Sequence, residues 1–375
     1  MTSRPPADSP MYVLVAGGGT AGHVLPGIAV ARALVERGHD FSSIHFVGSE
    51  RGIERTLVPE AGFGVTLLPG RGIQRRLTFA NLSAIWGLVR AVIKGIGIVR
   101  RSRPNIVLVV GGYASFACSV GAVLSRIPIV VMEQNARAGA ANRFAGRFAK
   151  ACAVPYAETD LPRRVVTGNP VRSEVLAINR DQDKHSARAQ LGVAADRVMV
   201  AVVTGSLGSR RVNEAVFAAV PHWAMRTDLS IRHVIGDRDW ESVQGRLPET
   251  DGLQYVALRY EDHMDIVLTA ADLLIGRAGG TTVAELAEAG LAGVLIPLPE
   301  APRDHQTANA EALVRVGAAR LIADSELDGD RLIATVQPLI DDPSLLDRMG
   351  RAAQTLAQPN AAGCVADLVE RHARR

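Results

Sequence analysis

Two glycines, two threonines and a glutamate lie close together between Ala278 and Glu285. They follow an apolar, strand-like run and begin a helix-like run that ends at Gly290. Backbone N–H groups at a helix start, together with the helix dipole, favour a phosphate group there. Glu285, one turn into the helix, could accept hydrogen bonds from a ribose diol. The segment therefore predicts a nucleotide-diphosphate site, although an ordinary strand-to-helix turn with a hydroxyl cap would contain the same residue types.

Glycine loops with the same strand–loop–helix order occur at three other places. The first, residues 17–23, formally matches the GxGxxG pattern of dinucleotide-binding proteins. That pattern needs an acid at the end of the second strand, and Glu50 comes too late, so NAD binding is disfavoured. The second loop is residues 111–115 and the third is residues 204–209. Two such loops at the carboxyl end of one sheet would frame the crevice in which open α/β sheets bind ligands.

Apolar, strand-like runs alternate with helix-like segments along the whole chain, which predicts an α/β protein with two Rossmann-like parallel-sheet domains facing a central cleft. Asn169-Pro170 cannot continue a strand or a helix, so the hinge is expected near residues 170–180. The predicted domains are residues 11–172, joined by a C-terminal helix within about 358–375, and residues 173–357. Residues 1–10 are polar and proline-rich, without an apolar signal core, and are predicted to be a disordered tail.

The charge is unevenly distributed between the two halves. Residues 1–170 contain 20 Lys and Arg against 9 Asp and Glu, whereas the remainder contains 22 against 29. The basic half favours an anionic partner. The three cysteines are far apart and show no metal-ligand spacing, which fits a reducing cytoplasm. No Asp-x-Asp metal clamp is evident either, so neither a metal nor another cofactor is expected.

The segment from Arg71 to Arg103 has an amphipathic, arginine-rich pattern. No acid occurs between Glu60 and Glu133. Apolar side chains within an acid-free basic stretch suit a helix that lies on anionic lipid. Core packing with solvated arginines remains an alternative, and nucleic-acid binding is disfavoured because aromatic–basic interleaving is absent elsewhere. The predicted membrane-contact residues are Ile73, Arg75, Arg76, Phe79 and Trp86.

These motifs together resemble the MurG family of bacterial glycosyltransferases, which have the GT-B architecture. The family adds N-acetylglucosamine to a lipid-linked muramyl-pentapeptide precursor of peptidoglycan. The resemblance spans nearly the whole chain, in the family's order. Its motifs are residues 18–23, 111–113, 133–135, 168–172, 277–285 and 304–310.

The resemblance implies that the C-terminal domain binds UDP-N-acetylglucosamine and that the N-terminal domain binds the polyprenyl-diphosphate-linked acceptor. It also implies a peripheral position on the cytoplasmic face of the cell membrane, with partners among cell-wall synthesis and division proteins. The implied donor contacts are Thr20, Ala21, Gly22, Asn135, Arg172, Ser206, Glu261, Gly280, Thr281, Thr282, Val283, Ala284, Glu285 and Gln306. The implied acceptor-diphosphate loops contain Gly19, Gly111, Gly112 and Tyr113.

This sequence departs from the family pattern at two places. The third loop reads Thr-Gly-Ser-Leu-Gly-Ser and lacks the family's glutamine, so diphosphate binding there depends on Ser206 and backbone N–H groups. The resemblance implies that Glu261, beside Tyr260, matches the uracil-facing position, where the family usually has an apolar residue.

The expected reaction is an inverting displacement that needs a base for the acceptor hydroxyl. His23 is the first candidate because its unperturbed pKa is near 6.5. Glu133, at the end of a buried strand-like run, is the second candidate, and it could instead orient the acceptor or His23. A UDP-N-acetylglucosamine 2-epimerase, or a non-catalytic protein that binds nucleotide sugars, remains an alternative function.

Overall fold

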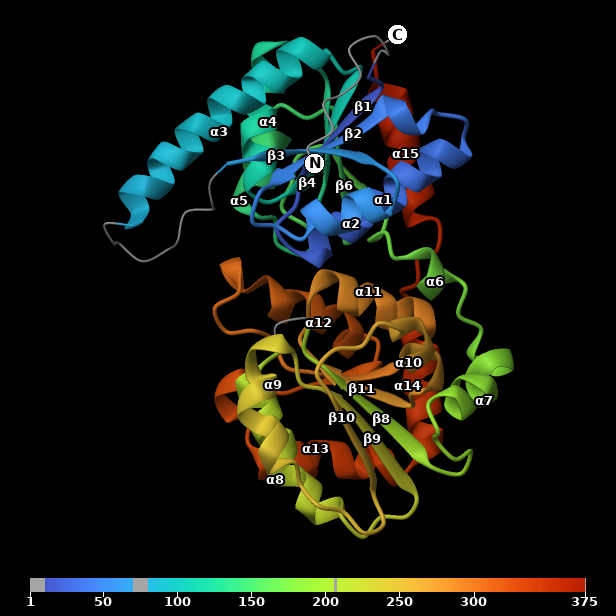
Figure 1. Cartoon of the computed structure of the whole chain (residues 1–375). Coiled ribbons are helices and arrows are strands. Elements are labelled where there is room, and N and C mark those ends of the chain that lie inside the picture. The colour runs from blue at the N-terminus through green and yellow to red at the C-terminus, as the bar shows by residue number, and fades with distance from the viewer. Residues whose placement is uncertain (1–10, 70–79, 206–207, 375) are drawn as a thin grey trace. The chain divides into compact units, whose positions relative to one another are not determined.

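The computed structural model describes residues 11–69, 80–205 and 208–374, and it describes side chains within the helix at 80–102 only from residue 87 onward. The chain divides into two compact units (Figure 1). The N-terminal unit comprises Met1–Arg172 together with Gln358–Arg375, and the C-terminal unit comprises Ser173–Ala357.

Seven described strands of the N-terminal unit form one parallel sheet with the order β3-β2-β1-β4-β5-β6-β7. The central strands β1 and β4 are buried along their entire length, because helices cover both faces of a parallel sheet. The strands are β1 Val13–Gly17, β2 Ile44–Ser49, β3 Gly64–Leu68, β4 Ile106–Gly111, β5 Ile129–Met132, β6 Ala151–Val154 and β7 Arg164–Val166.

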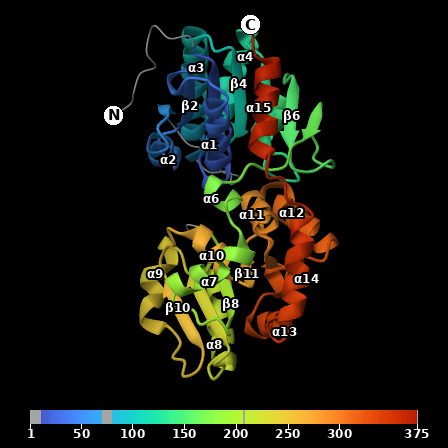
Figure 2. The ribbon, with the colours of Figure 1, turned by 90° about the vertical axis from the view of Figure 1, so that its right-hand side faces the viewer.

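The two faces of this sheet have separate cores. One contains apolar side chains from α3, α4 and α5, and the other contains side chains from α1, α2 and α15. The C-terminal helix α15 packs along α1 (Figure 2), where Arg37 donates hydrogen bonds to Asp367 and Glu370. The helices are α1 Ala21–Glu36, α2 Glu54–Glu60, α3 Ala80–Ser102, α4 Tyr113–Leu124, α5 Ala140–Gly146 and α15 Ala361–His372.

Six described strands of the C-terminal unit form a second parallel sheet, with the order β10-β9-β8-β11-β12-β13. Side chains from α8, α13 and α14 pack into the core on one of its faces. The strands are β8 Val198–Val203, β9 Leu229–Val234, β10 Gln254–Leu258, β11 Leu273–Gly276, β12 Ala292–Leu295 and β13 Ala319–Leu321. The helices are α6 Ser173–Leu176, α7 Arg180–Gln190, α8 Arg210–Trp223, α9 Asp237–Val243, α10 Met264–Ala270, α11 Gly280–Ala289, α12 His305–Arg315, α13 Gly329–Ile340 and α14 Pro343–Gln354.

The predicted class of two parallel-sheet α/β domains is confirmed by these sheets. Helix α1 begins at Ala21, so His23 lies inside its first turn. The predicted tail at residues 1–10 lies outside the described residues. Over the parts of the chain that the structure describes, no helix has both the length and the apolar character needed to cross a membrane.

Candidate active site

The first two glycine loops interlock at the carboxyl ends of β1 and β4. The Gly18 N–H donates to the Gly111 carbonyl at 3.1 Å. A Cβ on Gly17 would lie 2.3 Å from the Gly111 oxygen, and a Cβ on Gly112 would lie 2.3 Å from the Gly18 oxygen. All four residues have positive φ. Only glycine permits backbones to approach this closely in these conformations.

Ser115 forms hydrogen bonds with both the second loop and the end of β1. Its side chain is fully buried, and its hydroxyl oxygen accepts a hydrogen bond from the Gly111 N–H at 2.9 Å. The hydroxyl itself lies 2.6 Å from the Ala16 carbonyl, to which it can donate. The second loop is therefore tied to the end of β1 by a side chain as well as by backbone contacts.

His23 lies over the second loop. Its Nδ1 is 3.0 Å from the hydroxyl of Thr20, the N-cap residue of α1. A Cβ on Gly111 would lie 2.7 Å from the ring Cδ2 and 2.9 Å from Nε2, so the imidazole occupies the space that a larger residue would fill. The Thr20 side chain forms no capping hydrogen bond to the α1 backbone. Its hydroxyl instead holds the orientation of the His23 ring.

The Tyr113 side chain reaches carbonyl groups outside the second loop. Its hydroxyl lies 2.8 Å from the carbonyls of both Pro69 and Gly87. Burial, with a smaller contribution from the negative charge of Glu50, raises the pKa of this phenol. The side chain therefore connects α3 to the second loop.

Glu133 is buried, with 2% of its surface exposed, and it accepts five hydrogen bonds from N–H donors among the described residues. Its Oε1 accepts from the backbone N–H groups of Gln134 and Asn135 and from the Asn135 side chain, each at 3.0 Å. Its Oε2 accepts from the Gly139 N–H at 3.1 Å and from Asn142 Nδ2 at 2.9 Å. Five donors saturate the roughly four lone-pair sites of a carboxylate. The geometry therefore makes Glu133 the organiser of the loop that carries Asn135.

Glu54 is a buried residue at the site that the sequence analysis missed. Only 1% of its surface is exposed, and its Oε2 accepts from the Gly19 N–H at 2.8 Å. Its Oε1 accepts from the Ser49 N–H at 2.5 Å. A signal for it was present in the sequence: Gly48 and Gly52 flank the end of β2, which leaves space for a side chain to turn back under the first loop.

The predicted phosphate site is the start of α11 in the C-terminal unit. The N-cap residue is Gly279, which has no side chain to satisfy the first N–H groups of the helix. Asn309 donates to the carbonyl of Ala278 at 3.1 Å and supports the turn. Gly280 and Val283 are buried, whereas Thr281 and Thr282 are partly exposed. The predicted contacts from Gly280 to Glu285 thus lie in the first turns of one helix.

Arg277 connects this turn to the third glycine loop. Its guanidinium forms a 2.6 Å ion pair with Asp324 and donates to the Ser209 hydroxyl at 2.7 Å. Ser209 is the N-cap residue of α8. A Cβ on Gly208 would lie 2.0 Å from the Ile235 carbonyl oxygen, so this loop also depends on glycine. Ser206, the predicted diphosphate contact in this loop, lies outside the described residues.

Two predicted donor contacts have partners within the C-terminal unit. Glu261 forms a 2.7 Å ion pair with Arg232 and accepts from the His263 N–H at 3.0 Å. Gln306 accepts from the Leu298 N–H at 2.9 Å through its Oε1. Arg232 neutralises the carboxylate that the family pattern does not have, which explains how a charged residue is accommodated at the predicted uracil-facing position.

The remaining predicted residues all belong to the N-terminal unit. Thr20, Ala21 and Gly22 are at the start of α1, and Arg172 is the last residue of the first segment of the N-terminal unit. Trp86 lies in α3, but its side chain is not described. The other predicted membrane contacts, Ile73, Arg75, Arg76 and Phe79, lie outside the described residues.

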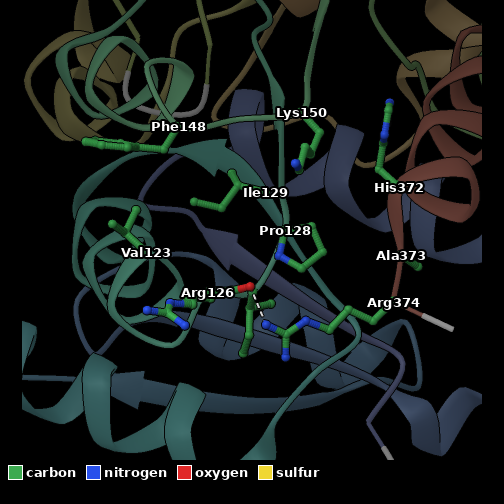
Figure 3. A pocket seen from close by; sticks show the side chains of 10 residues that line it. Val123, Arg126, Pro128, Ile129, Phe148, Lys150, His372, Ala373 and Arg374 are labelled. Atoms are coloured by element: carbon green, nitrogen blue, oxygen red, sulfur yellow. Dashed lines mark hydrogen bonds between the residues drawn. The ribbon is translucent and has the colours of Figure 1, made fainter.

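A cavity of about 480 Å³ lies elsewhere in the N-terminal unit (Figure 3). Its lining includes the basic residues Arg126, Lys150, His372 and Arg374, together with Ile129 at the amino end of β5. The glycine loops and Glu133 follow the carboxyl ends of their strands. The cavity is therefore at the opposite end of the strands from the first two glycine loops and Glu133.

Two family models match the chain. The glycosyltransferase family 28 N-terminal domain matches residues 13–154, and the glycosyltransferase family 28 C-terminal domain matches residues 199–364. A relative from Acidothermus cellulolyticus is 38% identical over 366 residues, which cover 97% of this chain and 98% of the relative. That relative is a UDP-N-acetylglucosamine–N-acetylmuramyl-(pentapeptide) pyrophosphoryl-undecaprenol N-acetylglucosamine transferase.

Two solved structures resemble this chain over nearly its whole length. The crystal structure of Acinetobacter baumannii MurG has a TM-score of 0.75 and 29% identity, covering 96% of this chain and 100% of that chain. A UDP-GlcNAc 2-epimerase from Neisseria meningitidis has a TM-score of 0.67 at 14% identity, covering 96% of this chain and 100% of that chain. At this identity the epimerase shares the fold alone.

Proposed function

The chain belongs to the MurG family of glycosyltransferase family 28, and from this premise we propose that it transfers N-acetylglucosamine from UDP-N-acetylglucosamine to an undecaprenyl-diphosphate-linked N-acetylmuramyl-pentapeptide. The observation that carries the proposal is 38% identity, over 97% of the chain, to a relative with that activity. The epimerase alternative is supported only by fold similarity at 14% identity. The enzyme is a hexosyltransferase.

His23 is the general base of the proposed mechanism. When its Nδ1–H donates to the Thr20 hydroxyl at 3.0 Å, the other ring nitrogen, Nε2, has the lone pair that can accept a proton. Nε2 takes the proton of the attacking acceptor hydroxyl as the new bond to the anomeric carbon forms. The bond from that carbon to the diphosphate oxygen breaks, and UDP leaves with inversion.

Glu133 acts in this mechanism as a positioning residue. Its carboxylate is saturated by five N–H donors, so it has no lone pair directed at a substrate hydroxyl. Its contribution is to hold Asn135, whose backbone and side chain both donate to it. This arrangement favours His23 over Glu133 as the base.

The two diphosphates are assigned to different units. The donor diphosphate binds at the α11 start, through the N–H groups of Gly280, Thr281 and Thr282, where the helix dipole stabilises the departing negative charge. The acceptor diphosphate binds at the second loop and the α4 start. The Gly19 N–H already donates to Glu54, so Gly19 contributes to the acceptor site through loop shape.

We propose further that the enzyme works at the cytoplasmic face of the membrane and contacts it through α3. The exposed face of α3 carries Val89 and Ile93, which are 42% and 64% exposed, one turn apart. The basic residues Arg90 and Lys94 stand beside them, also one turn apart and also exposed. An apolar ridge next to a basic ridge suits the boundary between acyl chains and anionic headgroups.

The test is transfer of labelled N-acetylglucosamine from its UDP donor to a lipid-linked muramyl-pentapeptide, with and without anionic vesicles. The expected result is a disaccharide on the lipid, formed faster when vesicles are present. Release of UDP without transfer, or recovery of 2-epimerised sugar, would refute the proposed reaction. Transfer that is indifferent to vesicles would refute the membrane contact alone.

A further inference from the structure

The buried carboxylate of Glu54 lies directly under the first glycine loop. Three glycines surround it: a Cβ on Gly18, Gly48 or Gly52 would lie 2.5, 2.2 or 2.0 Å from a Glu54 side-chain atom. Any side chain at these positions would displace the carboxylate. Three glycines around one acid thus form a fitted recess that joins the end of β2 to the loop after β1.

Within the described part of the chain, backbone N–H groups rather than basic side chains compensate the charge of Glu54. Among the described residues, no Lys, Arg or His lies within 4.0 Å of the Glu54 carboxylate, and its two hydrogen bonds come from the backbone N–H groups of Gly19 and Ser49. A buried carboxylate without a cation is costly unless N–H donors replace its hydration. The two hydrogen bonds from backbone amides supply this replacement, and they are strong because the carboxylate acceptor is charged.

The connection from Glu54 to the base is short and continuous. Glu54 holds the amide of Gly19, the residue immediately before Thr20. The Thr20 hydroxyl contacts His23 Nδ1 at 3.0 Å. On the other side, Gly18 packs against Gly112, and the His23 ring lies against the neighbouring Gly111. A shift of the first loop would therefore move two groups that contact the imidazole, Thr20 and Gly111.

We propose that Glu54 is a positioning residue for the transfer reaction: it fixes the first glycine loop and, through Thr20, the His23 base. This inference rests on the proposed function, because it assigns His23 to the chemistry. Glu54 touches neither the substrate nor the reacting atoms. Its contribution is to hold the base in the geometry for proton transfer, where a misplacement of about 1 Å can lower the rate about 10²-fold.

The direct test replaces Glu54 by Gln and observes the Gly19 amide by NMR in the ligand-free protein. The Gln amide group would place a donor against either the Gly19 or the Ser49 N–H. The expected result is loss of the downfield, exchange-protected Gly19 signal and a fall in kcat of about 10- to 10²-fold. UDP affinity, which is assigned to the C-terminal unit, should stay within about twofold.

Two matched variants complete the experiment. Gly52→Ala keeps the charge but pushes the carboxylate away, so it should reproduce both the Gly19 change and the lower kcat, even if Glu54→Gln does not fold. Glu60→Gln, at the exposed end of the same helix α2, should change neither.

The outcomes separate the inference from the proposed function. If Glu54→Gln or Gly52→Ala disturbs the Gly19 amide while kcat stays within twofold of wild type, the positioning role is wrong. An unchanged Gly19 signal in both variants would also overturn it. If the wild-type enzyme transfers no sugar, the proposed function fails, and the ligand-free Gly19 measurement still reports whether Glu54 holds the loop.

Discussion

Replacing Glu133 by Gln tests whether this residue organises the fold or acts as the base. The substitution preserves shape but turns one carboxylate oxygen into an N–H donor. Oε2 accepts two hydrogen bonds and Oε1 accepts three. Even if the new N–H donor takes the place of Oε2, the Gly139 N–H and Asn142 Nδ2 would lose their acceptor. Hydrogen bonds to a charged group contribute about 1.5–3 kcal/mol each, so the free energy of unfolding should fall by about 3 kcal/mol or more.

The assay is thermal unfolding together with steady-state transfer kinetics. For a domain of this size, about 3 kcal/mol corresponds to a Tm decrease of about 6–12 °C. We expect kcat to fall only about tenfold, because Asn135 loses part of its orientation while His23 remains. Glu36→Gln, an exposed substitution on α1, is the control. A Tm within about 1 °C of wild type combined with a kcat loss of about 10³-fold would refute the reasoning and make Glu133 the base.

Three other predictions follow from the same structure. His23→Ala should lower kcat about 10²-fold or more with little change in Tm, the reverse of the Glu133 pattern, and near-wild-type turnover would remove His23 from the mechanism. Ile93→Asp should weaken sedimentation with anionic vesicles about tenfold or more. The control Val166→Asp, on the exposed strand β7, should not weaken it. An equal loss of vesicle binding in both variants would argue against an α3 contact. Burial lowers the pKa of His45 to about 4 and of His233 to about 3, so the unfolded chain binds more protons below pH 6.5. The free energy of unfolding should therefore decrease, as pH falls from about 6 to 4, by about 1.4 kcal/mol per pH unit for each histidine, and denaturant melts of His45→Gln should show a shallower dependence.

The local pattern of the sequence determined the architecture. Apolar runs of strand length, separated by glycine loops and helix-like segments, require parallel sheets with both faces covered, and both sheets have this form. Helix ends could be read from single residues as well. Gly290 was predicted to end the helix after the diphosphate turn, and it adopts φ 62° and ψ 47° at the C-cap of α11. Such features depend on neighbours in sequence, which explains why they are visible without coordinates.

The positions of the loops could also be predicted from the sequence, but the roles of their side chains could not. Glu133 was predicted as a candidate base, and only the folded structure shows five N–H donors around it, from residues up to nine positions away. The hydroxyl of Tyr113 was near a predicted diphosphate loop, yet it meets carbonyls 26 and 44 positions away in the chain. These roles depend on how hydrogen-bond donors and acceptors are paired after packing.

Glu54 shows most clearly what tertiary structure alone decided. In the sequence it is one acid in a short amphipathic segment, 35 positions from the Gly19 amide that it holds. Its burial follows from the pairing of β1 with β2, which brings the ends of the two strands together, and from three glycines that leave space for its carboxylate. Residue types and spacing determine which elements form and where the loops lie. The contacts between distant loops decide which acid is buried, because burial and hydrogen bonding are properties of the assembled sheet.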